Sequence, residues 1–144
     1  MEYIFNEDEG SLSQRICDIN GIALEDLSTD AYRHDRQPDL IREFKEKLLS
    51  YKDESFFIVG DYDCDGICAV TIMKRLFDDL GIRANYYIPS RTKEGYGLNK
   101  KIVKTAYDNG FGVLLCVDNG VVCKEELALA REYGLKTFVI DHHE

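Results

Sequence analysis

Three aspartates at alternate positions, Asp61, Asp63 and Asp65, stand directly behind a short apolar run. The stretch Phe56–Met73 (FFIVGDYDCDGICAVTIM) predicts a buried strand, an acidic turn and the start of a helix. Carboxylates this close together repel one another unless a cation lies among them. The stretch therefore indicates a site for a divalent metal ion, although an ordinary polar turn would have a similar composition.

Further polar groups follow three later apolar runs. They are the segments 90–97 (SRTKEGYG), 118–120 (DNG) and 141–143 (DHH). The last of them contains two of the three histidines in the chain. Carboxylates and imidazoles are common metal ligands, so their joint chemistry depends on whether the fold brings these segments together.

Strands and helices are predicted to alternate from residue 38 onward. Pro38 suits the first turn of a helix, and large apolar residues then recur with helical spacing, which predicts an amphipathic helix of about 13 residues. Short apolar strands are predicted at 56–60, 84–88, 113–117 and 137–140, and helices at 67–80, 99–109 and about 124–133. Gly81, Gly110 and Gly134 are expected to end these three helices.

This alternation is typical of βαβ units and predicts an α/β fold with three layers, a mainly parallel sheet of about four strands flanked by helices. Right-handed crossovers bring the carboxyl ends of such strands to one edge, where open parallel sheets bind their ligands. The acidic segments are thus expected to lie side by side. Residues 1–37 are predicted to form an N-terminal extension with short helices near 11–20 and 24–27 and a loop at 30–37.

The predicted edge has the chemistry of a two-metal site. Carboxylates with one or two imidazoles suit Mn²⁺ or Mg²⁺ better than structural zinc, which prefers thiolates. Two such ions hydrolyse phosphate esters well. Arg91 and Lys93 supply cations for a phosphate, and Gly95 and Gly97 let backbone N–H groups approach an anion. An ordinary surface loop is equally compatible with the composition of 90–97.

Charge and composition narrow the class of protein. The 144-residue chain has a formal net charge of −9, which argues against a nonspecific duplex-binding module with a basic face. Bound metal ions would neutralise part of this charge. No apolar run approaches the roughly 20 residues of a membrane span, and the acidic start MEYIFNEDEG is unlike a secretory signal. Five scattered cysteines are predicted to be reduced thiols of a cytoplasmic protein.

Three other motifs fit the acidic turn less well. An EF-hand loop needs a glutamate at its twelfth position, which is Ile72 here, and a helix before it. Phosphatases of the haloacid dehalogenase type attack with a carboxylate of a strand-DxD motif, but usually have Thr or Val at the position of Asp65 and no Asp-His-His. The chain has no GxxxxGK[ST] loop, which argues against an NTPase.

The acidic segments together resemble motifs I, II and III of the DHH phosphoesterase superfamily. They read GDYDCDG at 60–66, VDNG at 117–120 and DHH at 141–143. The form GDYDxDG, with IPSRTKEGYG at 88–97 before motif II, is similar to the RecJ-like branch of single-strand-specific 5′→3′ exonucleases. Superfamily members acting on nanoRNA or cyclic dinucleotides usually open with His-x-x-x-Asp-x-Asp and lack this loop. The resemblance covers about residues 38–144.

The resemblance implies metal-dependent hydrolysis of single-stranded DNA in recombination and repair, with two Mn²⁺ or Mg²⁺ ions. Asp118 is implied to bridge both ions, and His143 to lie towards the scissile phosphate. The implied metal ligands are Asp61 (a ligand or a close neighbour of the ligands), Asp63, Asp65, Asp118 and His142. The implied catalytic residues are Asp118, His142 and His143, those supporting them are Asp141 and Asn119, and those facing substrate are Arg91, Gly95, Tyr96 and Gly97.

The resemblance also implies parts that are absent from these 144 residues. The superfamily has a fourth acidic motif and a second domain, DHHA1, and the RecJ-like branch adds an oligonucleotide-binding fold. Residues 38–144 are therefore expected to be the N-terminal part of a DHH domain whose partners are the remaining domains of the same protein. Two alternatives stay open: a phosphodiesterase for short oligonucleotides or cyclic dinucleotides, and a folded module without catalysis.

Overall fold

Strands and helices alternate along the chain in the computed structural model, which describes Gly21, Ala23 and residues 38–143. The elements are α2 (Pro38–Leu49), β1 (Phe56–Val59), α3 (Cys64–Asp79), β2 (Ala84–Tyr87), α4 (Lys100–Asp108), β3 (Val113–Val117), α5 (Lys124–Glu132) and β4 (Lys136–Ile140). The helices predicted near 11–20 and 24–27 and the loop predicted at 30–37 lie outside the described residues. The domain boundary predicted at residue 38 stays a prediction.

The four strands form one sheet in the order β2-β1-β3-β4, and all three neighbouring pairs are parallel. Phe56 is level with Ala84 on one side and with Val113 on the other, and Val113 is level with Lys136. Because the strands begin level and run in one direction, their carboxyl ends lie at one edge. The predicted parallel α/β fold is confirmed.

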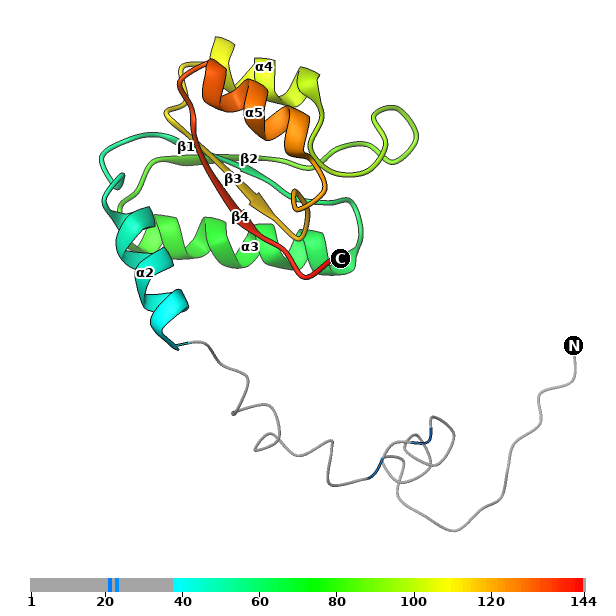
Figure 1. Ribbon diagram of the computed structural model, residues 1–144, viewed down its shortest axis with the longest axis horizontal. Helices are drawn as coiled ribbons and strands as arrows, with labels where there is room; N and C mark the ends of the chain where they lie inside the picture. Colours follow the sequence, from blue (N-terminus) through cyan, green and yellow to red (C-terminus); the bar gives the residue numbers. More distant parts are fainter. Residues whose placement is uncertain (1–20, 22, 24–37, 144) are drawn as a thin grey trace, which may run out of the picture. The chain divides into compact units, whose positions relative to one another are not determined.

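Two hydrophobic cores lie on opposite faces of the sheet, which gives the three predicted layers (Figure 1). Alternate residues of β1 serve the two faces, as strand geometry requires. Phe57 and Val59 pack in the core under α4 and α5, whereas Phe56 and Ile58 pack in the core with α3. The rings of Phe56 and Phe77 are 4.7 Å apart between centroids in the second core. The central strands β1 and β3 are buried along their whole length.

Helix α3 begins at Cys64, three residues before the predicted start. Part of the predicted acidic turn therefore belongs to the helix. The Asp63 side chain caps the helix by accepting a hydrogen bond of 3.1 Å from the N–H of Gly66, which satisfies a donor that helix geometry leaves free. Asp65 therefore lies in the first helical turn rather than in a loop. The other predicted strand and helix ends agree with the observed ends within about one residue.

Glycines end three helices as predicted. Gly81, Gly110 and Gly134 follow α3, α4 and α5 with φ of 69°, 74° and 85°, a conformation that glycine adopts without strain. Among the described residues, no helix has both the length and the apolar character needed to cross a membrane. The described cysteines, Cys64, Cys68, Cys116 and Cys123, are free thiols.

Candidate metal and phosphoester site

The acidic turn after β1 presents its three aspartates in different environments. Asp61 is fully buried, and neither of its carboxylate oxygens has a hydrogen-bond partner among the described residues. Asp63 and Asp65 are exposed. The hydrogen bond from the Gly66 N–H lowers the pKa of Asp63 and keeps it ionised. The turn thus offers two exposed carboxylates above a buried one.

Gly66 allows this turn to close tightly. A Cβ at this position would lie 2.6 Å from the Asp61 carbonyl oxygen and 2.8 Å from the Asp61 backbone nitrogen. Real Cβ contacts essentially never fall below 3.0 Å, so only glycine lets helix α3 begin against the backbone of Asp61. The glycine therefore sets the positions of Asp63 and Asp65 relative to β1.

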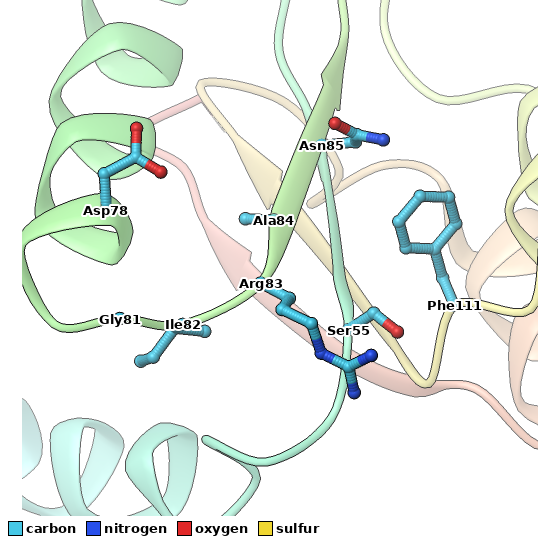
Figure 2. A pocket seen from close by; sticks show the side chains of 8 residues that line it. All are labelled: Ser55, Asp78, Gly81, Ile82, Arg83, Ala84, Asn85 and Phe111. Carbon is cyan, nitrogen blue, oxygen red and sulfur yellow. The ribbon is translucent and has the colours of Figure 1, made fainter.

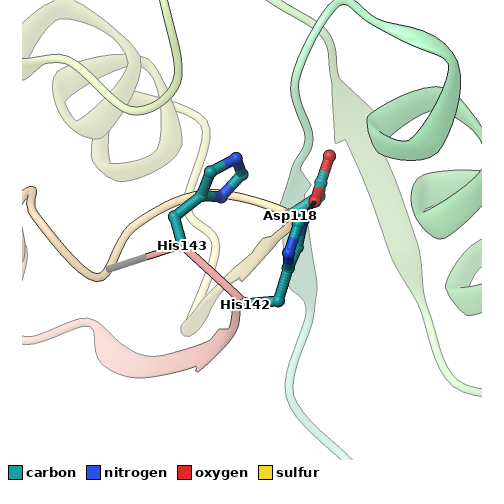
Figure 3. A group of neighbouring side chains, drawn as sticks. All are labelled: Asp118, His142 and His143. Atoms are coloured by element: carbon teal, nitrogen blue, oxygen red, sulfur yellow. Dashed lines mark ion pairs between the residues drawn. The ribbon is translucent and has the colours of Figure 1, made fainter. Parts of the chain in front are cut away.

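Asp118, after β3, is buried and faces His142, after β4 (Figure 3). Its Oδ1 lies 3.1 Å from Nε2 of His142. The same His142 nitrogen lies 3.9 Å from Oδ2 of Asp65. Burial, followed by the charges of Asp65 and Asp63, raises the pKa of Asp118. Its φ of 59° is in the left-handed region, which aspartate tolerates better than most residues. Its Oδ2 has no hydrogen-bond partner within the described part of the chain.

Two groups of three side chains could each hold a metal ion, because the potential ligand atoms within each group lie within 4.8 Å of one another. Asp118 belongs to both groups. The first comprises Asp63, Asp65 and Asp118, and the second Asp118, His142 and His143. Oxygen and imidazole donors suit Mn²⁺ or Mg²⁺, and the unpaired oxygens of buried Asp61 and Asp118 lack only a positive partner. The donors present therefore fit a divalent cation site. Asp61 is in neither group, so its predicted role as a direct ligand stays a prediction.

Asp141 lies behind the two histidines and orients them. Its Oδ1 accepts hydrogen bonds from the backbone N–H groups of His142 and His143, and from Nδ1 of His143 at 2.6 Å. Its Oδ2 accepts a hydrogen bond of 2.9 Å from the Val121 N–H. Burial alone would raise the pKa of Asp141, but these hydrogen bonds, led by that from Val121, lower it overall. The hydrogen bond to Asp141 in turn raises the pKa of His143.

The loop after β2 reaches this edge through Tyr96 and Gly97. The Tyr96 hydroxyl donates to the backbone carbonyl of Asp118 at 3.3 Å and lies 3.2 Å from the ring nitrogens of His143. Burial, followed by the charge of Asp61 and other carboxylates, raises the pKa of Tyr96 to about 12, so the hydroxyl stays protonated. Gly97, at φ 64°, packs against Asn119, which donates to the carbonyls of Val59 and Val117 and holds the ends of β1 and β3 together.

The remaining predicted substrate residues, Gly95 and Arg91, lie earlier in the same loop. Gly95, at φ 80°, has open space where a Cβ would be. Arg91 is exposed, and its guanidinium carbon lies 5.5 Å from the ring centroid of Tyr62. Tyr62 did not stand out in the sequence, since an aromatic residue between acids has no distinctive pattern. The same holds for Glu94, which closes the loop by accepting hydrogen bonds from the Tyr87 hydroxyl and the Ser90 N–H.

Two of the hollows formed by the described residues lie at opposite edges of the sheet. One lies at the amino-terminal edge of the sheet and is lined by Ser55, Asp78, Gly81, Ile82, Arg83, Ala84, Asn85 and Phe111 (Figure 2). None of the predicted site residues lines it. The other hollow adjoins the acids, with Ile72, Met73 and Ile140 on its apolar walls and Asp65, Asp118 and His142 on its polar side. The candidate site is therefore an open edge with an apolar groove beside it.

A comparison with protein families matches residues 55–144 to the DHH family, N-terminal domain. The chain belongs to the DHH family. The match includes all three acidic segments of the candidate site, so the family relationship and the geometry concern the same residues.

This DHH-family chain is similar to part of several curated proteins named single-stranded-DNA-specific exonuclease RecJ. It is 37% identical to the protein of Bacillus subtilis over 93 residues, which are 65% of this chain and 12% of that protein. It is 34% identical to the protein of Haemophilus influenzae over 91 residues, which are 62% of this chain and 16% of that protein. The chain thus spans only about an eighth to a sixth of the length of these relatives.

Solved structures agree with this relationship. A crystal structure of exonuclease RecJ bound to manganese superposes with a TM-score of 0.66 at 31% identity, covering 72% of this chain and 27% of that one. A structure of RecJ from Thermus thermophilus in complex with Mn²⁺ gives a TM-score of 0.60 at 27% identity, covering 72% of this chain and 14% of that one. Over this part the DHH-family chain has the fold of RecJ.

Proposed function

We propose that this chain is the N-terminal part of the catalytic domain of a RecJ-like exonuclease, which hydrolyses single-stranded DNA from the 5′ end in recombination and repair. The observation that carries the proposal is the meeting of Asp63, Asp65, Asp118 and His142 at one sheet edge, with Asp118 common to both potential ligand groups. The relatives named as RecJ, and the RecJ structures bound to manganese, support this substrate and this metal.

In this proposal the acids and His142 hold two Mn²⁺ or Mg²⁺ ions. Asp63 and Asp65 would hold separate ions, Asp118 would be shared by both, His142 would be a further ligand, and Asp61 would be a ligand or lie directly behind one. Such ions, when bound, lower the pKa of water and offset the negative charge that develops on a phosphate under attack. The number of acids at this edge, and the two overlapping groups of potential ligands, favour two ions over one.

The remaining side chains bind and orient the substrate. His143, held by Asp141 and protonated more readily for that reason, faces the phosphate as a hydrogen-bond donor. Tyr96 keeps its proton and holds His143 from the other side. Arg91 pairs with a backbone phosphate, and the Gly95–Gly97 turn lets the strand approach closely. Asn119 fixes the spacing of β1 and β3.

Titration calorimetry with Mn²⁺ tests the metal site directly. Mn²⁺ binding is expected for the wild-type chain, and Asp118→Ala is expected to abolish it because it removes the carboxylate common to both groups of potential ligands. Asp108→Ala is a matched control, since Asp108 is an exposed acid on α4 that pairs only with Lys104 among the described residues. Equal Mn²⁺ binding by the Asp118 and Asp108 variants would contradict the proposal.

Cleavage assays then separate substrate classes. A single-stranded 30-mer is expected to be degraded with Mn²⁺, and a duplex of the same sequence to resist. If a dinucleotide or a cyclic dinucleotide is hydrolysed faster than the 30-mer, the chain is instead a phosphodiesterase for short substrates. Metal binding without hydrolysis of any of these would leave a metal-binding module that needs the remainder of a longer protein.

A further inference from the structure

Tyr62 lies between two of the acids and contacts both arms of the loop after β2. It is half-buried, and its ring meets the ring of Tyr96 edge-on, with centroids 6.3 Å apart and planes at 88°. On the same tyrosine, the guanidinium carbon of Arg91 lies 5.5 Å from the ring centroid. Arg91 is near the start of the loop and Tyr96 near its end, so one side chain from the acidic turn holds both.

The contact with Tyr62 leaves Arg91 able to bind an anion. Among the ion pairs formed by the described residues, none involves Arg91, although the chain has nine more acidic than basic residues. A guanidinium over a tyrosine is attracted by the negative face of the ring. A cation–π contact of this kind engages the charge of the guanidinium and leaves N–H donors available for the forked pairing that phosphate favours.

The aromatic contacts continue from Tyr62 to the histidines. Tyr96 meets His143 edge-on, with ring centroids 5.7 Å apart and planes at 81°, and its hydroxyl is 3.2 Å from that imidazole. Arg91 is thus connected to the candidate metal edge through Tyr62, Tyr96 and His143, which belong to three different strand ends. A change at Tyr62 would loosen the arginine without removing a metal ligand.

We infer that Tyr62 is a positioning residue, which holds the guanidinium of Arg91 over the substrate path and so strengthens binding of a phosphate of the single strand. Tyr62 is not among the potential metal ligands and, in this role, does not touch the reacting phosphate. The inference rests on the proposed function for its substrate, but the contact between Arg91 and the ring of Tyr62 can be measured without catalysis.

NMR spectroscopy of the Arg91 side chain gives that independent measurement on the 144-residue chain. Protons of Arg91 above the ring of Tyr62 are expected to be shifted upfield, to lose this shift in Tyr62→Leu, and to retain it in Tyr62→Phe, which keeps the ring. Tyr107→Leu, at an exposed tyrosine of α4, controls for loss of a tyrosine elsewhere. Arg91 signals that are the same in the wild type and Tyr62→Leu overturn the inference.

A double-mutant cycle tests whether Tyr62 acts through Arg91. Tyr62→Leu is expected to raise KM for a single-stranded oligonucleotide about two- to fivefold with little change in kcat, the size of an exposed cation–π contact. In an Arg91→Ala background the same substitution is expected to have no further effect. An equal rise of KM in both backgrounds overturns the inference. Absence of Mn²⁺ binding by the wild-type chain would count against the proposed function, whereas the NMR result decides the role of Tyr62 whether or not the 144-residue chain cleaves DNA by itself.

Discussion

Replacing Gly66 by alanine is expected to damage the candidate site through the backbone alone. In an exposed helix, alanine would stabilise the chain by about 1 kcal/mol relative to glycine. Here its Cβ would lie 2.6–2.8 Å from three backbone atoms of Asp61, and backbone atoms cannot rotate away. Overpacking of this kind costs about 3 kcal/mol at the upper end of its usual range. Subtracting the gain in helix propensity from the packing cost leaves a free energy of unfolding lower by about 2 kcal/mol. For a folded unit of this size, that corresponds to a Tm lower by roughly 8–15 °C.

The same displacement is expected to weaken metal binding. Moving the start of α3 away from Asp61 shifts Asp63 and Asp65 relative to Asp118, and disturbed support of metal ligands typically lowers affinity about 10–100-fold. Differential scanning calorimetry measures Tm, and titration calorimetry measures Mn²⁺ affinity. Gly110→Ala is the control. An alanine at its φ of 74° is expected to lower the free energy of unfolding by about 1–2 kcal/mol, but Gly110 follows α4, away from the acids. A Gly66→Ala variant with wild-type Tm would refute the packing argument, and a lower Tm with unchanged Mn²⁺ affinity would refute the link to the site.

Three further substitutions follow from the charges of the site and its loop. Asp118→Asn removes a buried carboxylate whose pKa is raised by burial and by neighbouring acids. In EDTA, urea unfolding is therefore expected to show a free energy of unfolding about 0.5–2 kcal/mol higher than that of the wild type. A lower free energy of unfolding would contradict this. Hydrogen bonds from Ser90 and then Tyr87 lower the pKa of Glu94 below its ordinary 4.5, so its stabilisation is present above that pH and is lost as the pH falls through the folded-state pKa. Glu94→Gln should thus lower the urea midpoint at pH 7, and this effect should shrink as the pH falls below 4.5; an effect of the same size at every pH would refute the role of the charge. Asp141→Asn is expected to lower the pKa of His143, which the hydrogen bond to Asp141 raises; an NMR titration with an unchanged midpoint would exclude that cause.

The order of the elements could be predicted from the sequence because the signals are local. The run Phe56–Val59 is apolar at every position, which is typical of a central strand covered on both faces. Gly81, Gly110 and Gly134 each follow a helical pattern and each adopt the left-handed conformation that ends a helix. Parallel pairing then follows from the helical crossovers, and the shared edge follows from parallel pairing.

Contacts between distant residues could not be predicted in the same way. The expectation that Tyr96 faces the substrate stays a prediction, and nothing in the sequence indicated that its hydroxyl lies against His143, which is 47 residues away. The early start of α3 depends on the packing of Gly66 against the Asp61 backbone, which no propensity describes. In the sequence, Glu94 is one of several charged residues in a polar loop. Its hydrogen bonds from the Tyr87 hydroxyl and the Ser90 N–H are evident only in the structure. Spacing identifies candidates, whereas their partners depend on tertiary structure.

The alternating aspartates of motif I illustrate where spacing stops being informative. Asp61, Asp63 and Asp65 are chemically identical, but Asp61 is fully buried while the other two are exposed. Asp61 and Asp118 are the buried acids of the described residues, and both have carboxylate oxygens without a hydrogen-bond partner there. Burying such groups unpaired costs free energy that packing has to offset. Asp118 belongs to both groups of potential ligand atoms, so a cation bound by either group would stabilise the folded chain. The unfolding free energy of this chain is therefore expected to rise with Mn²⁺ concentration according to the affinity of the site.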